Sequence, residues 1–197
     1  MFTGIVQSLG TIRRIVPTAD GWRLTVDLPS GFGKLMRGMS LAVNGICVSV
    51  AEYQGRQCMA DIMPETGRRT TFHRWRVGDK VNLERPLRSS DELGGHFVTG
   101  HIDGMGKILK AVHRQREVRM TIRVPQLFMR YVAAQGSVAI DGVSLTVTQV
   151  RDMAFTVAFI PYTLTHTILG NLHVGDMVNI EVDILARYLD RLRAYEK

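Results

Sequence analysis

Short stretches of apolar and β-branched residues alternate with turn residues through most of the chain. In 46–50, for example, apolar residues take every second position and Cys47 and Ser49 lie between them. This period of two is typical of a strand that turns one face toward a core. Pairs such as Asp20-Gly21 and Asn44-Gly45 separate the stretches, and they favour tight turns between antiparallel strands.

Much of this pattern occurs twice. The segment VNGICVSV at 43–50 recurs 97 positions later as IDGVSLTV at 140–147, and 78–84 recurs at the same spacing as 175–181. About six strand-like stretches fit into each copy, at the spacing of roughly 8 to 12 residues that all-β domains show. The sequence therefore predicts an all-β fold of two similar six-stranded antiparallel barrels of Greek-key type. Each barrel is expected to be closed, which leaves no edge strand exposed.

The segment 86–95 (PLRSSDELGG) has the composition of a connector and lies where the repeat restarts. We therefore expect one barrel over 1–95 and a second over 96–183. The remainder, 184–197, carries apolar residues at 185, 188, 192 and 195 and predicts an amphipathic helix. A helix this short is marginal alone in water. Its stripe is expected to cover either its own barrel or the equivalent helices of neighbouring subunits.

The charge and the cysteines narrow the class of protein. The net charge is +7 and the isoelectric point about 9.8, but the basic residues are scattered rather than clustered among aromatics, so no nucleic-acid surface is predicted. With 197 residues, two cysteines, no apolar run long enough for a membrane span and no charged-then-apolar leader, we expect a reduced, cytoplasmic protein without a membrane segment.

The outward positions of the repeated strand carry groups that could do chemistry. Cys47 and Ser49 lie there in the first copy, and Ser144 and Thr146 in the second. They are either small polar side chains of a solvated strand face or a pair of matched sites, of which only the first has a thiol.

Two histidines flank 97–100. Five positions apart, His96 and His101 would lie on opposite faces of a straight strand, which argues against a shared metal ion. Each is either a structural side chain or a proton carrier near neutral pH. The sequence has no phosphate-binding loop, no Gly-x-Gly-x-x-Gly and no Gly-x-Ser-x-Gly, so nucleotide-driven and hydrolase chemistries lose support.

Taken together, several blocks resemble the riboflavin synthase family: MFTGIV at 1–6, NGIC at 44–47, LGGH at 93–96, GH at 100–101, DGVSLTV at 141–147 and VNIEVD at 178–183. The resemblance spans nearly the whole chain. It implies two barrels with a C-terminal helix, assembled as a homotrimer whose active site lies between the first barrel of one subunit and the second barrel of its neighbour. The implied reaction is the dismutation of two molecules of 6,7-dimethyl-8-ribityllumazine. A four-carbon unit moves from one to the other and gives riboflavin and 5-amino-6-ribitylamino-uracil, with no metal and no organic cofactor.

The resemblance also implies site residues. The catalytic candidates are His101 and Ser40 as proton-transfer or polarising groups and Cys47 as a helper at the acceptor, and Phe2 and Asp183 are expected to position them. Ligand contacts on the first barrel are expected at Gly4, Ile5, Val6, Cys47, Val48, Ser49, Asp61, Ile62, Met63, Pro64, Glu65 and Thr66. On the second barrel they are expected at His96, Gly100, His101, Ile102, Gln135, Ser144, Leu145, Thr146, Ile160, Pro161, Tyr162, Thr163, Leu164 and Thr165.

Two positions depart from the family pattern. The family has Leu-Thr after its cysteine where this chain has Val48-Ser49, and often a lysine where this chain has Gln135. Serine keeps the hydroxyl group, whereas the loss of a cation at 135 affects the expected contact with pyrimidine carbonyls. The rival interpretation is a non-catalytic carrier that binds a lumazine or flavin. Docking to lumazine synthase, the enzyme that supplies the lumazine, is a further partner that the resemblance suggests, and the sequence leaves open which barrel holds the donor.

Overall fold

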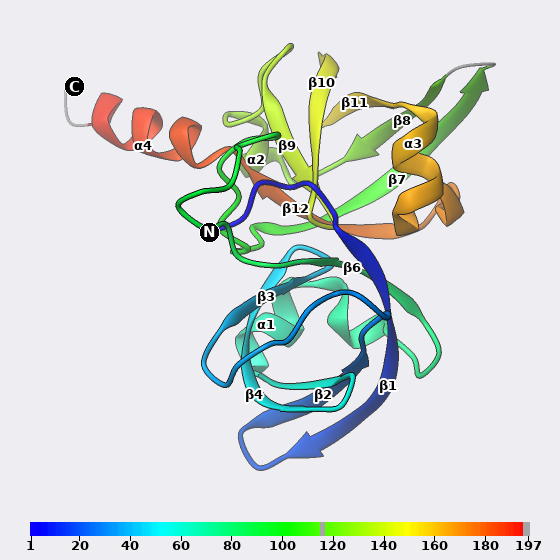
Figure 1. Cartoon of the computed structure of the whole chain (residues 1–197). Coiled ribbons are helices and arrows are strands. Elements are labelled where there is room, and N and C mark those ends of the chain that lie inside the picture. The colour runs from blue at the N-terminus through cyan, green and yellow to red at the C-terminus, as the bar shows by residue number, and fades with distance from the viewer. Residues whose placement is uncertain (115–116, 195–197) are drawn as a thin grey trace.

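The computed structural model describes residues 1–114 and 117–194, which form two closed antiparallel barrels and a C-terminal helix. The barrels lie one above the other in Figure 1, with the first barrel below. Both are six-stranded, as the sequence predicts. The two repeats arrange their strands in the same order, β1-β2-β5-β4-β3-β6 in the first and β7-β8-β11-β10-β9-β12 in the second.

The strands of the first barrel are β1 (Ser8–Thr18), β2 (Gly21–Asp27), β3 (Ser40–Val43), β4 (Ile46–Gln54), β5 (Gln57–Ile62) and β6 (Lys80–Glu84). Helix α1 (Pro64–Arg69) and a 3-10 turn (Thr71–Arg74) connect β5 to β6. The strands of the second barrel are β7 (Gly104–Arg114), β8 (Glu117–Arg123), β9 (Ser137–Ile140), β10 (Val143–Arg151), β11 (Ala154–Phe159) and β12 (Met177–Val182). Its helical segments are α2 (Gln126–Met129), α3 (Pro161–His166) and a 3-10 turn (Ile168–Asn171).

The alternation read from the sequence fixes which face of each strand is buried. In β4 the side chains of Ile46, Val48 and Val50 are buried, and Cys47 and Ser49 face outward. In β10 the equivalent residues behave in the same way, with Ser144 and Thr146 outward. Each barrel encloses its own apolar core.

The two barrels touch at their equivalent hairpin turns, a contact that we call the seam. Asn44-Gly45 joins β3 to β4 and Asp141-Gly142 joins β9 to β10, all four with positive φ, as a two-residue hairpin of type I′ requires. The turns are packed so closely that a Cβ atom on Gly45 would lie 2.6 Å from the backbone nitrogen of Gly142. The Asn82 side chain donates to the Asp141 carbonyl, and the Asn179 side chain donates to the Asn44 carbonyl.

The first residues of the two repeats run antiparallel between the barrels. Phe2 and Val98 form an isolated β-bridge, and both are buried with Ala42 and Ala139 in a small apolar cluster of their own. The segment that carries the two histidines is otherwise irregular. The straight strand assumed for 96–101 in the sequence analysis is therefore wrong, because this stretch pairs through a single bridge and bends between the barrels.

Helix α4 (Ile184–Arg193) follows β12 and projects from the second barrel (Figure 1). Asp183 caps it by accepting a hydrogen bond from the Leu185 N–H, and Arg187 pairs with Asp103. The predicted apolar stripe is real, but the described chain does not cover it: Leu185, Tyr188 and Leu192 are 55%, 65% and 63% exposed. Of the two alternatives left open by the sequence, packing of the stripe on its own barrel is therefore the one that the described chain does not show. Tyr195, the last residue of the expected stripe, lies outside the described residues.

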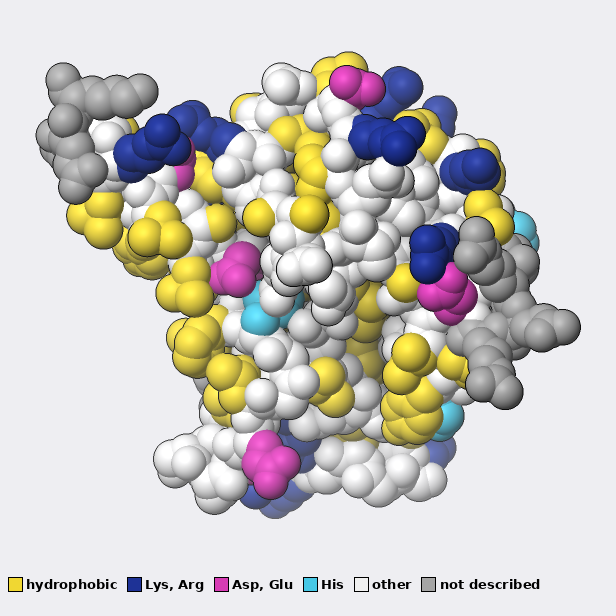
Figure 2. All heavy atoms as spheres, turned by 90° about the horizontal axis from the view of Figure 1, so that it is seen from above, with side chains coloured by type: hydrophobic (Ala, Val, Ile, Leu, Met, Phe, Trp, Pro, Cys, Tyr) yellow, Lys and Arg dark blue, Asp and Glu magenta, His cyan; other side chains and the backbone are white. Residues whose placement is uncertain are grey.

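Hydrophobic side chains lie along one side of this protruding helix, and arginine side chains lie along the other (Figure 2). Among the described residues, no helix combines the length and the apolar character needed to cross a bilayer.

Candidate active site

Two equivalent carboxylates hold the first residues of each repeat in place. Glu84 at the end of β6 accepts hydrogen bonds from the Thr3 N–H (2.6 Å), the Thr3 hydroxyl (2.7 Å) and the Gly4 N–H (3.0 Å). Glu181 at the end of β12 accepts the same three bonds from Thr99 and Gly100. Burial raises the pKa of each carboxyl, and the hydrogen bonds oppose that rise.

Each held segment crosses to the other barrel, to the strand that carries Ser144 or Cys47. The Gly4 carbonyl accepts from the Ser144 N–H (2.8 Å) of β10, and the Gly100 carbonyl accepts from the Cys47 N–H (2.9 Å) of β4. Beyond these glycines, Val6 packs against the core of the second barrel and Ile102 against the core of the first.

This crossing corrects the grouping of site residues made from the sequence. Gly4, Ile5 and Val6 belong beside Ser144 rather than beside Cys47, and Gly100, His101 and Ile102 belong beside Cys47 rather than beside Ser144. A repeat alignment shows which positions are equivalent, but it does not show against which barrel they pack.

The first candidate site is a small cavity of about 150 Å³ beside Cys47. Its wall includes His101 and Ile102 from the crossing segment and Thr66 from α1; the other lining residues are Ile46, Glu65, Arg69, Thr70 and Gly100. Glu65 pairs with Arg68 and Arg69, which keeps the pKa of its carboxyl below the usual value. The thiol of Cys47, the exposed imidazole of His101 and the hydroxyl of Thr66 therefore line the same cavity.

At the second site, Ser144 and His96 are hydrogen-bonded. The Oγ atom of Ser144 lies 2.7 Å from the Nδ1 atom of His96. The imidazole is 8% exposed, and its Nε2 atom is buried without a hydrogen-bond partner in the described chain. Burial lowers the pKa of His96, and the nearby carboxylate of Asp183 opposes the shift. Burial therefore favours the neutral imidazole, and the tautomer decides which of the two atoms, His96 Nδ1 or Ser144 Oγ, donates the hydrogen bond.

Helix α3 carries the remaining predicted contacts of the second site. Ile160 and Tyr162 are exposed, and the Tyr162 ring stacks on His166 at 3.9 Å between ring centroids. This surface is more apolar than the equivalent turn α1, where Glu65 stands in the position of Tyr162. The two sites share a backbone plan and differ in their side chains.

Several predicted residues do not reach either site. Phe2 is fully buried in the cluster between the barrels, so it can position the crossing segments but cannot contact a ligand within one chain. Ser40 pairs with Ser49 across β3 and β4 and is absent from the lining of the Cys47 cavity. Gln135 is exposed in a turn with φ of 65°, and Asp61 pairs with Arg23 on the surface.

The side chains of Val48, Ile62 and Leu145 face the barrel cores, so only their backbone atoms could contact a ligand. Glu84 and Glu181 were missed as site residues. Their signal was present in the repeated segments Val81–Glu84 and Val178–Glu181, each of which places a carboxylate at the end of an apolar strand.

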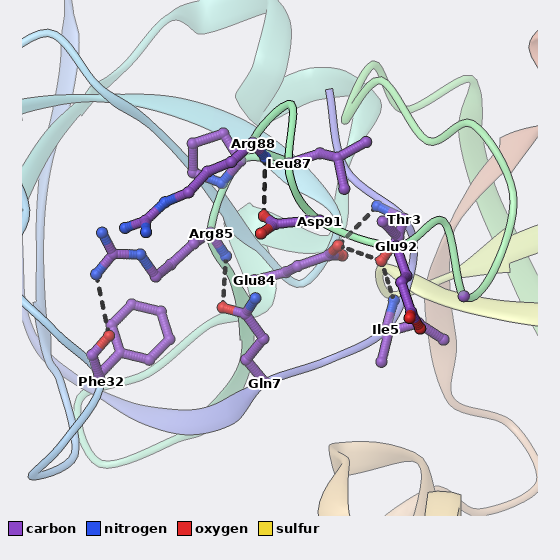
Figure 3. Close-up of a pocket in the computed structure, with 12 residues that line it drawn as sticks. Thr3, Ile5, Gln7, Phe32, Glu84, Arg85, Leu87, Arg88, Asp91 and Glu92 are labelled. Carbon is purple, nitrogen blue, oxygen red and sulfur yellow. Dashed lines mark hydrogen bonds between the residues drawn. The ribbon is translucent and has the colours of Figure 1, made fainter.

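A larger cavity of about 530 Å³ lies beside Glu84. Residues of the first crossing segment (Thr3 and Ile5) and of the connector 86–95 line it. Figure 3 shows that several of its polar groups are already paired: the Arg85 guanidinium donates to the Phe32 carbonyl, the backbone N–H groups of Arg85 and Arg88 donate to Gln7 and Asp91, and Glu84 holds Thr3. Neither Cys47 nor Ser144 lines this cavity. The candidate site residues therefore lie at the Cys47 cavity and at the Ser144–His96 pair rather than in this larger cavity.

The comparisons with known proteins agree with this duplicated geometry. The model of the lumazine binding domain matches residues 3–86 and 99–183, once in each repeat. The chain is 39% identical to the riboflavin synthase of Brucella abortus, with 100% of both chains covered. It is 40% identical to that of Mycobacterium bovis, with 98% of both covered. The chain belongs to the riboflavin synthase family. A third relative is the riboflavin synthase of Photobacterium phosphoreum, which is 37% identical to this chain over 100% of this chain and 91% of its own length.

This member of the riboflavin synthase family is also similar to solved structures, among them complexes of LumP. The complex of LumP with 6,7-dimethyl-8-(1'-D-ribityl) lumazine matches with a TM-score of 0.83 at 28% identity, over 92% of this chain and 99% of that one. The complex with riboflavin matches with a TM-score of 0.85, also at 28% identity and the same coverage. The fold is therefore shared by proteins whose solved complexes hold a lumazine and a flavin.

Proposed function

We propose that the chain is a riboflavin synthase that converts two molecules of 6,7-dimethyl-8-ribityllumazine into riboflavin and 5-amino-6-ribitylamino-uracil. The observation that carries the proposal is the duplicated site. Each barrel presents one nucleophile-bearing strand to one crossing segment, at Cys47 with Gly100 and at Ser144 with Gly4. Two copies of one site suit a reaction whose donor and acceptor are the same compound.

The reaction needs no external oxidant or reductant, because the four-carbon unit that one lumazine loses is the unit that the other lumazine gains. Two new carbon–carbon bonds join the four-carbon unit of the donor to that of the acceptor, the two linkages between the donor unit and its ring nitrogens break, and the protons lost from the methyl groups end on those nitrogens. The pyrimidine diamine then leaves. Holding the two heterocycles in register can lower the activation free energy by up to about 7–11 kcal/mol. Positioning of the two substrates therefore accounts for most of the rate enhancement.

The side chains supply nucleophiles and proton carriers. The 7-methyl group of one lumazine loses a proton, and C7 of the other is activated by addition of a nucleophile. Cys47 with His101 supplies such a pair in the first barrel, and Ser144 with His96 supplies one in the second. The two histidines come from a single crossing segment, which delivers one to each nucleophile. Asp183 supports the second site from the N-cap of α4. Ser40 lies outside the Cys47 cavity, so it takes part only in a site that a neighbouring subunit completes.

The complete active site forms between subunits of a homotrimer. The uncovered stripe of α4 supports this assembly, since Leu185, Tyr188, Leu189 and Leu192 are all more than half exposed, and burying such a stripe against equivalent helices is favourable. The first barrel of one subunit then faces the second barrel of its neighbour, and a lone subunit is inactive.

A second candidate function is that of a lumazine or flavin carrier, favoured by the similarity to the LumP complexes. Turnover separates the two functions. The purified chain is incubated with 6,7-dimethyl-8-ribityllumazine alone, and riboflavin is followed by its absorbance and fluorescence. We expect riboflavin in many-fold molar excess over protein. Tight binding with an unchanged ligand spectrum would support the carrier and contradict the synthase.

A further inference from the structure

Two buried asparagines reach from one barrel into the other. Asn82 lies on β6 of the first barrel and Asn179 at the equivalent position of β12, and they are 2% and 0% exposed. Besides its bond to a hairpin turn at the seam, each accepts a second bond from the backbone of the opposite barrel. Asn179 Oδ1 accepts from the Thr71 N–H (2.7 Å), and Asn82 Oδ1 accepts from the Ile168 N–H (2.9 Å). The side-chain amide of each barrel is therefore satisfied by the other barrel.

The bond from Asn179 holds a wall of the Cys47 cavity. Thr71 begins the 3-10 turn that follows α1. The preceding residue, Thr70, donates to the Thr66 carbonyl from its N–H (3.2 Å) and from its hydroxyl (2.7 Å), which ties the turn to the helix. Thr66 and Thr70 both line the cavity. A residue of the second barrel thus fixes an element beside the thiol of the first.

The bond from Asn82 holds the equivalent element of the second barrel. Ile168 begins the 3-10 turn that follows α3. Thr167 donates to the Thr163 carbonyl from its N–H (3.1 Å) and from its hydroxyl (2.7 Å), as Thr70 does in the first barrel. Asn82 therefore stands to α3 as Asn179 stands to α1.

Both helices need such support. Each has six residues, and no side chain of the described chain caps its N-terminus. Helices of this length are not stable alone in water, so contacts with the rest of the protein determine where they lie. The first N–H groups of a helical turn have no partner within the turn, and the asparagine carbonyls supply that partner.

We propose that Asn179 and Asn82 are positioning residues exchanged between the barrels: Asn179 orders α1 beside Cys47, and Asn82 orders α3 in the second barrel. The candidate site of each barrel is then complete only when the other barrel is docked on it. The inference rests on the proposed function for its catalytic meaning, because it concerns the same two sites. Its test uses no substrate and is read separately from turnover.

The test measures amide hydrogen exchange of the full chain by mass spectrometry, in the wild type and in Asn179→Ala and Asn82→Ala. We expect Asn179→Ala to speed exchange in α1, over 65–70, about tenfold and to leave 162–167 within about twofold of the wild type. Asn82→Ala should do the reverse. A merely structural role would not produce this crossed pattern, because a general loss of stability speeds exchange in both helices of both variants.

Alkylation of Cys47 by iodoacetamide measures the first site directly. The other cysteine, Cys58, is 2% exposed, and burial raises the pKa of its thiol to about 11, so the two thiols are distinguished by rate and by mass. Asn179→Ala should speed the alkylation of Cys47 about threefold or more. Asn82→Ala should leave the rate unchanged, although Asn82 lies in the same barrel as Cys47.

Val178→Ala is the matched control. Val178 is the neighbour of Asn179 on β12 and is fully buried in the core of the second barrel, so its truncation lowers stability without removing a bond between the barrels. It should leave α1 exchange and Cys47 alkylation at the wild-type rates.

The proposal is overturned if Asn179→Ala leaves α1 exchange unchanged, if Asn82→Ala loosens α1 rather than α3, or if Val178→Ala has the same effect as Asn179→Ala. Each asparagine variant tests one half of the pattern by itself, so the proposal remains testable where one of them does not fold. Failure of the turnover assay with the crossed pattern intact would contradict the proposed function alone.

Discussion

The Nδ1 atom of His96 lies 2.7 Å from the Oγ atom of Ser144. This hydrogen bond joins a residue of the crossing segment to the outward face of β10. The equivalent strand β4 carries Cys47, and its histidine, His101, is exposed rather than buried. The two barrels therefore share one framework and differ in the burial of the histidine beside Cys47 or Ser144.

His96→Asn tests the role of the buried imidazole. The asparagine amide can still bond to Ser144, but it cannot take up a proton, so we expect riboflavin formation to fall about 100-fold or more. Since burial lowers the pKa of His96, the wild-type rate should decline on the acid side only below the usual histidine value of about 6.5. Steady-state rates between pH 5 and 8 measure both effects. A variant with the wild-type rate and pH profile would reduce His96 to a structural role.

Gly100→Ala should disrupt the first site. Gly100 has φ of 79°, and a Cβ atom there would lie 2.5 Å from Cβ of Cys47. The left-handed backbone and the clash together should lower the free energy of unfolding by about 2–4 kcal/mol, as denaturant titration measures. Gly55→Ala is the control, because Gly55 has φ of 60° with nothing within 4 Å of the added atom. Equal losses in the two variants would show that close packing on Cys47 is unimportant.

Asp141→Asn should alter the pH dependence of stability. Burial raises the pKa of Asp141 to about 7, so between the unfolded value of about 3.9 and pH 7 the folded state binds more protons and stability falls as the pH rises. The variant lacks this titration. We expect it to match the wild type near pH 5 and to be more stable at pH 8, by roughly 1–3 kcal/mol. Urea unfolding at both pH values checks this, and a wild type that is the more stable at pH 8 would contradict it.

The apolar stripe of α4 can be tested by charge. A Tyr188→Asp and Leu192→Asp double variant should remain folded, because both side chains are more than half exposed, but it should become monomeric and inactive. Native mass spectrometry measures the oligomeric state of each variant. Ala194→Asp introduces a charge at the end of the same helix, away from the stripe, and should leave the trimer intact. A double variant that still assembles would show that α4 does not hold the subunits together.

The periodicity of the sequence was sufficient for the barrels, because a period of two with Gly-containing turns leaves little choice of strand or of buried face. The outward positions of Cys47 and Ser144 could be predicted for the same reason. The crossing of Gly4 and Gly100 to the opposite barrels could not be predicted, since equivalence in a repeat does not say which copies pack together. The buried state of His96 depends on the same crossing, and so does the enclosure of Phe2.

The central claim is that two copies of one compound react at paired sites, and the stoichiometry of turnover tests it most directly. With 6,7-dimethyl-8-ribityllumazine as the sole reactant, lumazine consumed and riboflavin formed are quantified by chromatography over the full time course. The account predicts one riboflavin for every two lumazines consumed, with the pyrimidine diamine appearing in equal amount. Riboflavin formed one for one with lumazine, or no riboflavin at all, would contradict it.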